Sequence, residues 1–278
     1  MLIIELDNGV KMKTAILKIS GKTISEFIET NKWIELIKNL YEVYDSVVLV
    51  HGAGKTISEW ADKIGLETKF IDGQRVTTSE YMEIVAAVQA GLINSQLSAK
   101  LNSCGIEAAG FSGIDRNTFT AKIFDENLGL VGYPELTGSK EWIEALLSNK
   151  VLPVFSSVCK DSEGTLINVN ADIFTEVLAA AIQADSVLFV SDVDGVIING
   201  EVKKQLNTSE IVNGILSGEI TGGMIPKLKS CASLLYKGIN KIWIGSKLNH
   251  QTITNNEDFN GTWIIGSAEE NKQLHYVA

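Results

Sequence analysis

Residues 15–21 read AILKISG, and residues 47–54 read VVLVHGAG, so that an apolar strand runs into a glycine turn twice. In each turn, backbone N–H groups converge where a helix is about to begin, and such a place attracts anions. Residues 222–227 read GGMIPK and supply a third glycine turn. Lys18 and Lys227 add two full positive charges, which a transferring phosphoryl group requires. The sequence therefore predicts a site that handles phosphate.

Both strand-end turns continue with Lys-Thr and so imitate the end of a P-loop. A P-loop needs a glycine five positions before its Gly-Lys pair, and this chain has Ile16 and Leu49 at those positions. The dinucleotide-binding fingerprint fails as well, because its third glycine would stand where the chain has Ile57. The spacing argues against a P-loop nucleotide-binding protein and against a nicotinamide-dependent dehydrogenase.

Composition and charge limit the classes of protein that need to be considered. The 278 residues, 45% of them hydrophobic, can form one large α/β domain or two lobes. A net charge of −10 without a basic stripe argues against a nucleic-acid partner. Three cysteines without CxxC spacing indicate reduced thiols, with neither a disulfide nor a zinc site. An acidic amino terminus and the lack of any apolar run near ~18 residues indicate a cytoplasmic protein with no membrane partner.

Strands alternate with amphipathic helices along the chain, which predicts a mostly parallel sheet covered on both faces. Helices are expected over residues 30–44 and from a capping box at residues 77–80 to Leu101, with Gly105 ending the second one. Further strands are expected at residues 106–111, 151–155, 186–190 and 241–244. The Asn-Gly pair at residues 199–200 predicts a hairpin with a type I′ turn over residues 196–203. We place a boundary between two lobes near residue 180.

Residues 168–172 read NVNAD and precede an apolar helical pattern. Asn170 is predicted to cap this helix, which leaves Asn168 free and places Asp172 in the first turn. These five residues alone fit a well-capped helix without any other role equally well.

The two lysines occupy electrostatically unusual positions. Lys227 is expected in the first turn of a helix with Pro226 at its first position and Gly238 just past its end. The helix N-terminus repels a cation there by roughly 0.3–1 kcal/mol, which an anion nearby would offset. A surface lysine whose stem lies along apolar groups is the alternative. Lys18 has apolar neighbours in its strand, and a buried lysine needs a partner.

With these motifs in this order, the chain resembles the amino-acid kinase family over roughly residues 14–245 and, within it, the N-acetylglutamate kinases. The motifs that carry the resemblance are residues 18–21, 51–54, 73–77, 128–132, 168–172, 191–195 and 222–227. The resemblance implies a three-layer α/β/α sandwich with a mostly parallel central sheet and two lobes. Residues 1–180 would form an amino-terminal lobe for acylglutamate binding and dimerisation. Residues 181–278 would form a carboxyl-terminal lobe for ATP binding.

The resemblance implies ATP-dependent phosphorylation of the side-chain carboxylate of N-acetyl-L-glutamate, which gives an acyl phosphate and ADP in arginine biosynthesis. The implied catalytic residues are Lys18, Lys227 and Asp172. The implied substrate contacts are Gly52, Ala53, Arg75 and Asn168. The implied nucleotide contacts are Gly21, Ser191, Asp192, Val193, Gly223 and Met224. The carboxylate nucleophile is ionised at neutral pH and needs no general base. Mg²⁺ would be carried by the nucleotide phosphates and not by a protein metal site.

The chain departs from the family's pattern at Ser20 and Ala53, where the family usually has glycine. Their Cβ atoms narrow the approach of a ligand to the backbone and restrict positive φ.

The motifs also leave open another N-acylated substrate, such as N-succinylglutamate or an aminoadipate derivative, and a non-catalytic amino-acid or nucleotide sensor of the same fold. We interpret His51 as a hydrogen-bonded structural group and residues 115–116 as a loop. We expect a homodimer that arginine does not inhibit. The sequence of residues 246–278 indicates no function.

Overall fold

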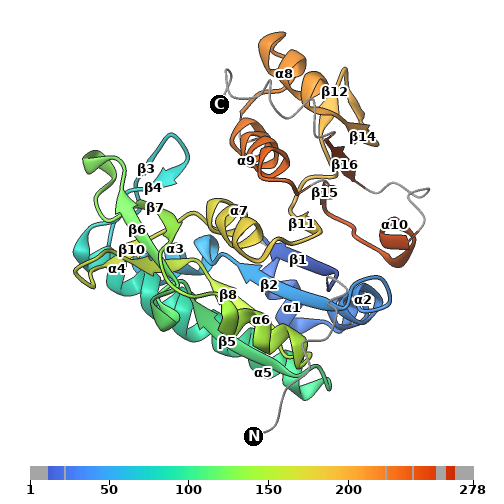
Figure 1. The fold of residues 1–278 in the computed structure, drawn as a ribbon. Coiled ribbons are helices and arrows are strands. Elements are labelled where there is room, and N and C mark those ends of the chain that lie inside the picture. Colours follow the sequence, from blue (N-terminus) through green and yellow to red (C-terminus); the bar gives the residue numbers. More distant parts are fainter. Residues whose placement is uncertain (1–11, 22, 223, 240, 255–260, 267–278) are drawn as a thin grey trace, which may run out of the picture.

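The computed structural model describes residues 12–21, 23–222, 224–239, 241–254 and 261–266, which form a layered α/β structure (Figure 1). Its central sheet has eight strands in the order β14-β16-β15-β11-β1-β2-β8-β5. These strands are β1 (Thr14–Ile19), β2 (Ser46–His51), β5 (Ala108–Ser112), β8 (Leu152–Ser156), β11 (Ser186–Val190), β14 (Gln205–Leu206), β15 (Lys241–Gly245) and β16 (Thr262–Ile265). All neighbouring pairs are parallel except β15 with β16. The predicted mostly parallel sheet is confirmed.

Helices cover both faces of the sheet. On one face lie α1 (Ile24–Glu29), α2 (Lys32–Leu40), α3 (Gly54–Lys63), α4 (Ser79–Val85), α5 (Asn94–Ser103) and α10 (His250–Thr254). On the other lie α6 (Glu141–Ser148), α7 (Ala171–Ile182), α8 (Thr208–Leu216) and α9 (Met224–Tyr236). Alternate residues of β1 belong to different cores, since Leu17 packs in the first and Ile16 in the second. The predicted three-layer arrangement follows from this alternation.

Four hairpins project from the layers. They are β3 (Phe70–Ile71) with β4 (Gln74–Arg75), β6 (Phe119–Ile123) with β7 (Gly132–Leu136), β9 (Val158–Lys160) with β10 (Leu166–Asn168), and β12 (Ile197–Ile198) with β13 (Glu201–Val202). Short 3₁₀ turns occupy Asp115–Asn117 and Glu126–Leu128. Figure 1 shows the first three hairpins gathered at one end of the molecule. The turn of the fourth has φ 56° at Asn199 and φ 78° at Gly200, as a type I′ turn requires.

The expected helices are present, with corrected boundaries. The helix predicted over residues 30–44 is α2, which ends at Leu40. The capping box at residues 77–80 is wrong, because Thr78 caps α4 by accepting the Tyr81 N–H, while the Thr77 hydroxyl donates to the Arg75 carbonyl oxygen. Gly105 and Gly238 follow the ends of α5 and α9 with φ of 78° and 90°, as predicted.

Two further features differ from expectation. Helix α9 begins at Met224, so Pro226 is its third residue and not its first. Proline is tolerated there because N–H groups in the first turn have no intrahelical acceptor. The long helix after residue 78 is interrupted by η1 (Ala86–Ile93), a stretch of π-helix between α4 and α5.

Candidate active site

The two glycine turns at the carboxyl ends of β1 and β2 touch each other. Ile19 pairs with His51 in the sheet, and the Gly52 N–H donates to the Ile19 carbonyl oxygen at 3.4 Å. A Cβ atom on Gly21 would lie only 2.8 Å from the Gly54 backbone nitrogen. Glycine at position 21 therefore permits a backbone approach that a side chain would prevent.

Neither departure from the family's glycine pattern strains the backbone. Ala53 has φ −153°, and Ser20 is not among the non-glycine residues with positive φ. The Ser20 N–H donates to the Val190 carbonyl oxygen at 3.1 Å and so is not directed at a ligand. Across the described ranges, the N–H groups of Gly21 and Ala53 have no acceptor. They remain available to an anion at the uncapped N-terminus of α3.

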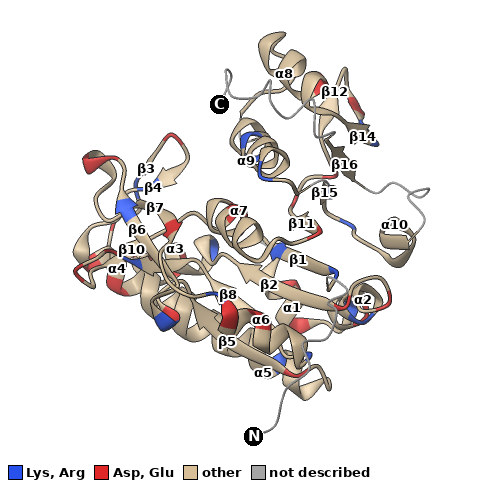
Figure 2. Ribbon diagram, in the orientation of Figure 1, with Lys and Arg blue, Asp and Glu red and all other residues tan. Residues whose placement is uncertain are grey.

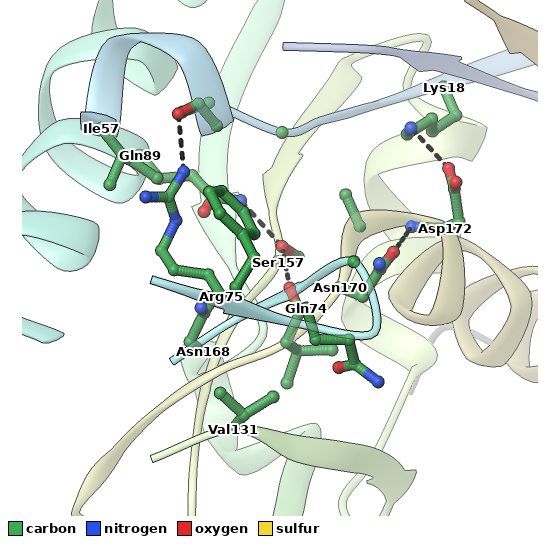
Figure 3. Close-up of a pocket in the computed structure, with 17 residues that line it drawn as sticks. Lys18, Ile57, Gln74, Arg75, Gln89, Val131, Ser157, Asn168, Asn170 and Asp172 are labelled. Atoms are coloured by element: carbon green, nitrogen blue, oxygen red, sulfur yellow. Dashed lines mark hydrogen bonds and ion pairs between the residues drawn. The ribbon is translucent and has the colours of Figure 1, made fainter. Parts of the chain in front are cut away.

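Lys18, Asp172 and Lys227 meet as one charged cluster. Lys18 comes from β1, Asp172 from the first turn of α7, and Lys227 from the first turn of α9. The Lys18 Nζ lies 2.5 Å from Asp172 Oδ1 (Figure 3). The Lys227 Nζ lies 3.1 Å from Asp172 Oδ2. Asn170 caps α7 as predicted, since its Oδ1 accepts the Asp172 N–H at 2.8 Å.

Glu176 of α7 binds both α9 and the lysine that follows it, so the two helices are joined at a second point. Glu176, one turn after Asp172, lies 2.5 Å from the Lys237 Nζ and also accepts the Ser233 hydroxyl at 2.6 Å. Figure 2 shows the basic positions of β1 and α9 on either side of α7, which carries acidic ones.

With all three groups ionised, the cluster has a net charge of +1 in a largely buried setting. The exposed fraction of the side chain is 7% for Lys18, 21% for Asp172 and 12% for Lys227. Burial opposes ionisation of Asp172, but the two ammonium groups outweigh it and lower the pKa of Asp172 to about 2. Burial and the neighbouring Lys227 lower the pKa of Lys18, although Asp172 acts in the opposite direction. A second anion would complete the charge balance of this cluster.

A cavity of about 240 Å³ adjoins Lys18 and Asp172 (Figure 3). It is also lined by the four residues expected to contact substrate: Gly52, Ala53, Arg75 and Asn168. The structure thus brings two of the three predicted catalytic residues and all of the predicted substrate residues to one cavity. Lys227 does not line this cavity but contacts Asp172, which does.

Arg75 is a buried cation without a counter-ion. Only 9% of the residue is exposed, and no carboxylate pairs with it anywhere in the part of the chain that the structure describes. Its Nη1 donates to the Tyr81 hydroxyl at 2.6 Å, and its Nη2 donates to the Gly54 carbonyl oxygen at 2.8 Å and to Ser58 at 3.0 Å. Its guanidinium lies 4.8 Å from the centre of the Phe70 ring. These contacts fix its orientation while its charge remains available to an anion.

The predicted nucleotide residues are only partly brought together. Gly21 and Asp192 line a second cavity of about 710 Å³, which shares Arg75 with the first one. Ser191 donates to Asp192 at 3.2 Å and lines a third cavity of about 540 Å³. Val193 and Met224 pack against the hydrophobic core, and Gly223 lies outside the described residues.

Two buried amides surround His51, an arrangement that the sequence analysis did not predict. Gln89 donates to the His51 carbonyl oxygen at 3.3 Å, and Asn94 donates to the His51 ring at 3.1 Å. Burial lowers the pKa of His51 to about 4, so its ring is neutral, and the structural interpretation of His51 is confirmed. The signal that could have indicated this network is the pair of amide side chains, Gln89 and Asn94, within an otherwise apolar helical pattern.

The remaining interpretations concern a loop, the cysteines and metal or membrane binding. Asp115 accepts the Ser112 N–H at 2.6 Å, which confirms that residues 115–116 belong to a capped loop.

All three cysteines are free, and burial raises the pKa of the Cys159 thiol to about 12. Within the described ranges, no group of three His, Cys, Asp or Glu residues is arranged to hold a metal ion. Among those same residues, every helix is too short or too polar to cross a membrane.

Comparison with known proteins gives a consistent result. The amino acid kinase family matches residues 13–246. The acetylglutamate kinase of Dehalococcoides mccartyi is 35% identical over 90% of this chain and 94% of its own length. That of Brachyspira hyodysenteriae is 33% identical over 84% and 82%.

Solved structures show the same fold. The structure of smu.665 from Streptococcus mutans UA159 is 28% identical, with a TM-score of 0.77 over 91% of this chain and 98% of that one. A carbamate kinase from Giardia, 16% identical, covers 92% and 99% with a TM-score of 0.63 and supports the fold alone. From the family match, the relatives and the fold together, this chain belongs to the amino acid kinase family.

Proposed function

We propose that the protein transfers the γ-phosphoryl group of ATP to the side-chain carboxylate of N-acetyl-L-glutamate, which yields ADP and an acyl phosphate in arginine biosynthesis. The observation that carries this proposal is the Lys18–Asp172–Lys227 cluster at one cavity with the uncompensated cation Arg75. Relatives named acetylglutamate kinase match this chain over most of its length and support the choice of substrate.

The cluster addresses the main difficulty of this reaction, which is the repulsion between two anions. The attacking carboxylate and the transferring phosphoryl group must approach in line. Lys18 and Lys227 neutralise the charge that they bring together, and Asp172 holds both ammonium groups in place. No proton has to be removed from the ionised carboxylate, so the neutral, hydrogen-bonded His51 is not required as a base.

The opposite part of the cavity holds the rest of the substrate in this proposal. Arg75 binds the α-carboxylate, because its planar guanidinium suits a carboxylate and lacks one in the described structure. Asn168 hydrogen-bonds the substrate, and Gly52 and Ala53 line the path of the reacting carboxylate. The free N–H groups of Gly21 and Ala53 face the negative charge of the phosphoryl group.

ATP binds on the carboxyl-terminal side in this proposal, next to Gly21. Its partners are Ser191, Asp192, Val193, Gly223 and Met224. Mg²⁺ enters bound to the nucleotide phosphates. Residues 1–180 bind acylglutamate and form a homodimer, whereas residues 181–278 bind ATP, with the division inside α7. The reduced thiols suit a cytoplasmic location.

The test is a coupled ADP-release assay with Mg²⁺-ATP and each of three acceptors: L-glutamate, N-acetyl-L-glutamate and N-succinyl-L-glutamate. Preferential turnover of N-acetyl-L-glutamate, with acyl phosphate trapped by hydroxylamine, supports the proposal. Preference for N-succinyl-L-glutamate would keep the chemistry and change the acyl group. Flat traces with all three would favour a non-catalytic sensor. Lys18→Met should abolish turnover, whereas Lys122→Met, at an exposed lysine, should not.

A further inference from the structure

Gln89 is a buried polar residue with one hydrogen-bonding atom left unused. Only 3% of it is exposed, and it lines the cavity that holds Lys18, Arg75 and Asp172. Its Nε2 donates to the His51 carbonyl oxygen at 3.3 Å. It also donates to the Ser157 hydroxyl at 2.8 Å (Figure 3). These two bonds use both amide hydrogens. Among the described residues no donor reaches Oε1, although it is not sealed from the cavity.

The orientation of this amide is fixed by its partners. The His51 carbonyl oxygen can only accept, so the NH₂ group must face it and Oε1 must face away. Ser157 uses its own hydrogen to donate to the Val169 carbonyl oxygen at 2.6 Å and therefore accepts from Gln89. Ser157 is 1% exposed, so the pair is rigidly enclosed. Gln89 consequently presents an acceptor, and not a donor, to the cavity.

The π-helical stretch explains how Gln89 reaches this place. Gln89 and Asn94 are five residues apart, and both contact His51. Five residues match the i→i+5 spacing of π-helix, whereas the α-helical neighbours on one face are three or four apart. The helical geometry of η1 thus brings both amides to His51, with Gln89 lining the cavity.

The charges around Gln89 restrict which donor can meet its oxygen. Asp172 is the only acidic residue that lines this cavity in the described structure, and it is already paired with two lysines. A free α-ammonium group would lie in a cavity lined by Lys18 and Arg75, with no unpaired protein carboxylate to neutralise it. A neutral N–H meets the need of the Gln89 oxygen without adding charge. An N-acylated glutamate carries such a group next to the α-carboxylate.

Building on the proposed function, we propose that the Gln89 Oε1 accepts the amide N–H of the N-acylated substrate and that Ser157 is the residue that positions it. Gln89 is then a specificity-determining residue, because its oxygen favours an N–H over a linkage without hydrogen, while the surrounding cations disfavour a charged amine. Sites built to hydrogen-bond a substrate N–H discriminate strongly against analogues that lack it.

The experiment compares kcat/KM for N-acetyl-L-glutamate and for 2-acetoxyglutarate, in which an ester oxygen replaces the N–H. The wild-type protein should favour the amide by on the order of tenfold, since the ester leaves the Gln89 oxygen unpaired. Gln89→Leu should bring the amide-to-ester ratio to about one. Ser157→Ala should reduce the ratio partly, with a larger effect on KM than on kcat. Gln96→Leu makes the same change at an exposed position of α5 and should leave the ratio unchanged.

The amide-to-ester ratio decides whether Gln89 accepts the substrate N–H. A wild-type ratio near one overturns the inference while leaving the proposed function intact, and this result needs no variant to fold. An unchanged ratio in Gln89→Leu also overturns it, provided that the variant melts like the wild type. Absence of phosphoryl transfer to any N-acylated glutamate refutes the proposed function and this inference together.

Discussion

Replacing Asp172 with Asn removes the shared partner of two buried ammonium groups without changing the size of the side chain. At the 3.1 Å separation between Lys227 and Asp172, two unit charges attract by about 5 kcal/mol for an effective dielectric constant near 20. Leaving a buried charge without its partner typically costs about 3–5 kcal/mol. If about 3–4 kcal/mol of this is lost from the transition state, kcat should fall by roughly 100- to 1,000-fold.

The substrate affinity should change much less in this variant. Arg75 is held by Tyr81, Gly54 and Ser58, and none of these contacts involves Asp172. The KM for N-acetyl-L-glutamate should therefore stay within about fivefold, and the loss should appear in kcat. ADP release at saturating Mg²⁺-ATP measures both constants. The control is Glu163→Gln, which removes the same charge at an exposed position.

The same variant tests the electrostatic argument through acid stability. The folded-state pKa of Asp172 is about 2, below its ordinary value of 3.8, so ionised Asp172 stabilises the fold by about 2 kcal/mol. This contribution is fully present above about pH 4 and is lost as the pH falls toward 2. Urea unfolding of Asp172→Asn should lack that loss. A variant that keeps kcat within threefold of the wild type would refute the role assigned to the cluster.

The other predictions concern the substrate cation, the buried histidine and the contact between the glycine turns. Arg75→Lys should raise the KM for N-acetyl-L-glutamate by about 10- to 100-fold in steady-state assays, because a lysine cannot replace the planar guanidinium; an unchanged KM would contradict its assignment. The pKa of His51 falls from 6.5 to about 4, so wild-type stability should drop by about 3 kcal/mol between pH 6.5 and pH 4, and chemical unfolding of His51→Gln, but not of His250→Gln, should lack this slope. Gly21→Ala should destabilise the protein by about 1–3 kcal/mol in thermal melts, since its Cβ would meet the Gly54 nitrogen, and a neutral result would mean that the turns can separate.

The sheet could be predicted because parallel strands leave a strong sequence signal. Residues 186–190 were expected as a strand buried on both faces, and β11 has those bounds with every residue buried. The cap at Asn170 was equally clear, since an Asn before an apolar helical pattern has few other uses. These predictions relied on local chemistry alone.

The errors arose where two neighbouring residues could serve the same purpose. Thr77 and Thr78 both fit a cap, and only the demand of the Arg75 carbonyl oxygen decides between them. Apolar periodicity does not distinguish the π-helix of η1 from α-helix, so the direction of Gln89 could not be predicted. Lys18 and Lys227 meet at Asp172 because of the fold, and only the family resemblance predicted that Asp172 is their shared partner.

The central place of β1 has a consequence for synthesis on the ribosome. One neighbour, β2, emerges soon after it, but the other, β11, is made only at residues 186–190. Until then the nascent half-sheet of β1, β2, β8 and β5 has β1 as an open edge, although all six residues of β1 are buried in the folded protein. Slow translation between residues 160 and 186 should therefore expose the chain to misassociation, and chaperone dependence should be greatest for nascent chains that end in this interval.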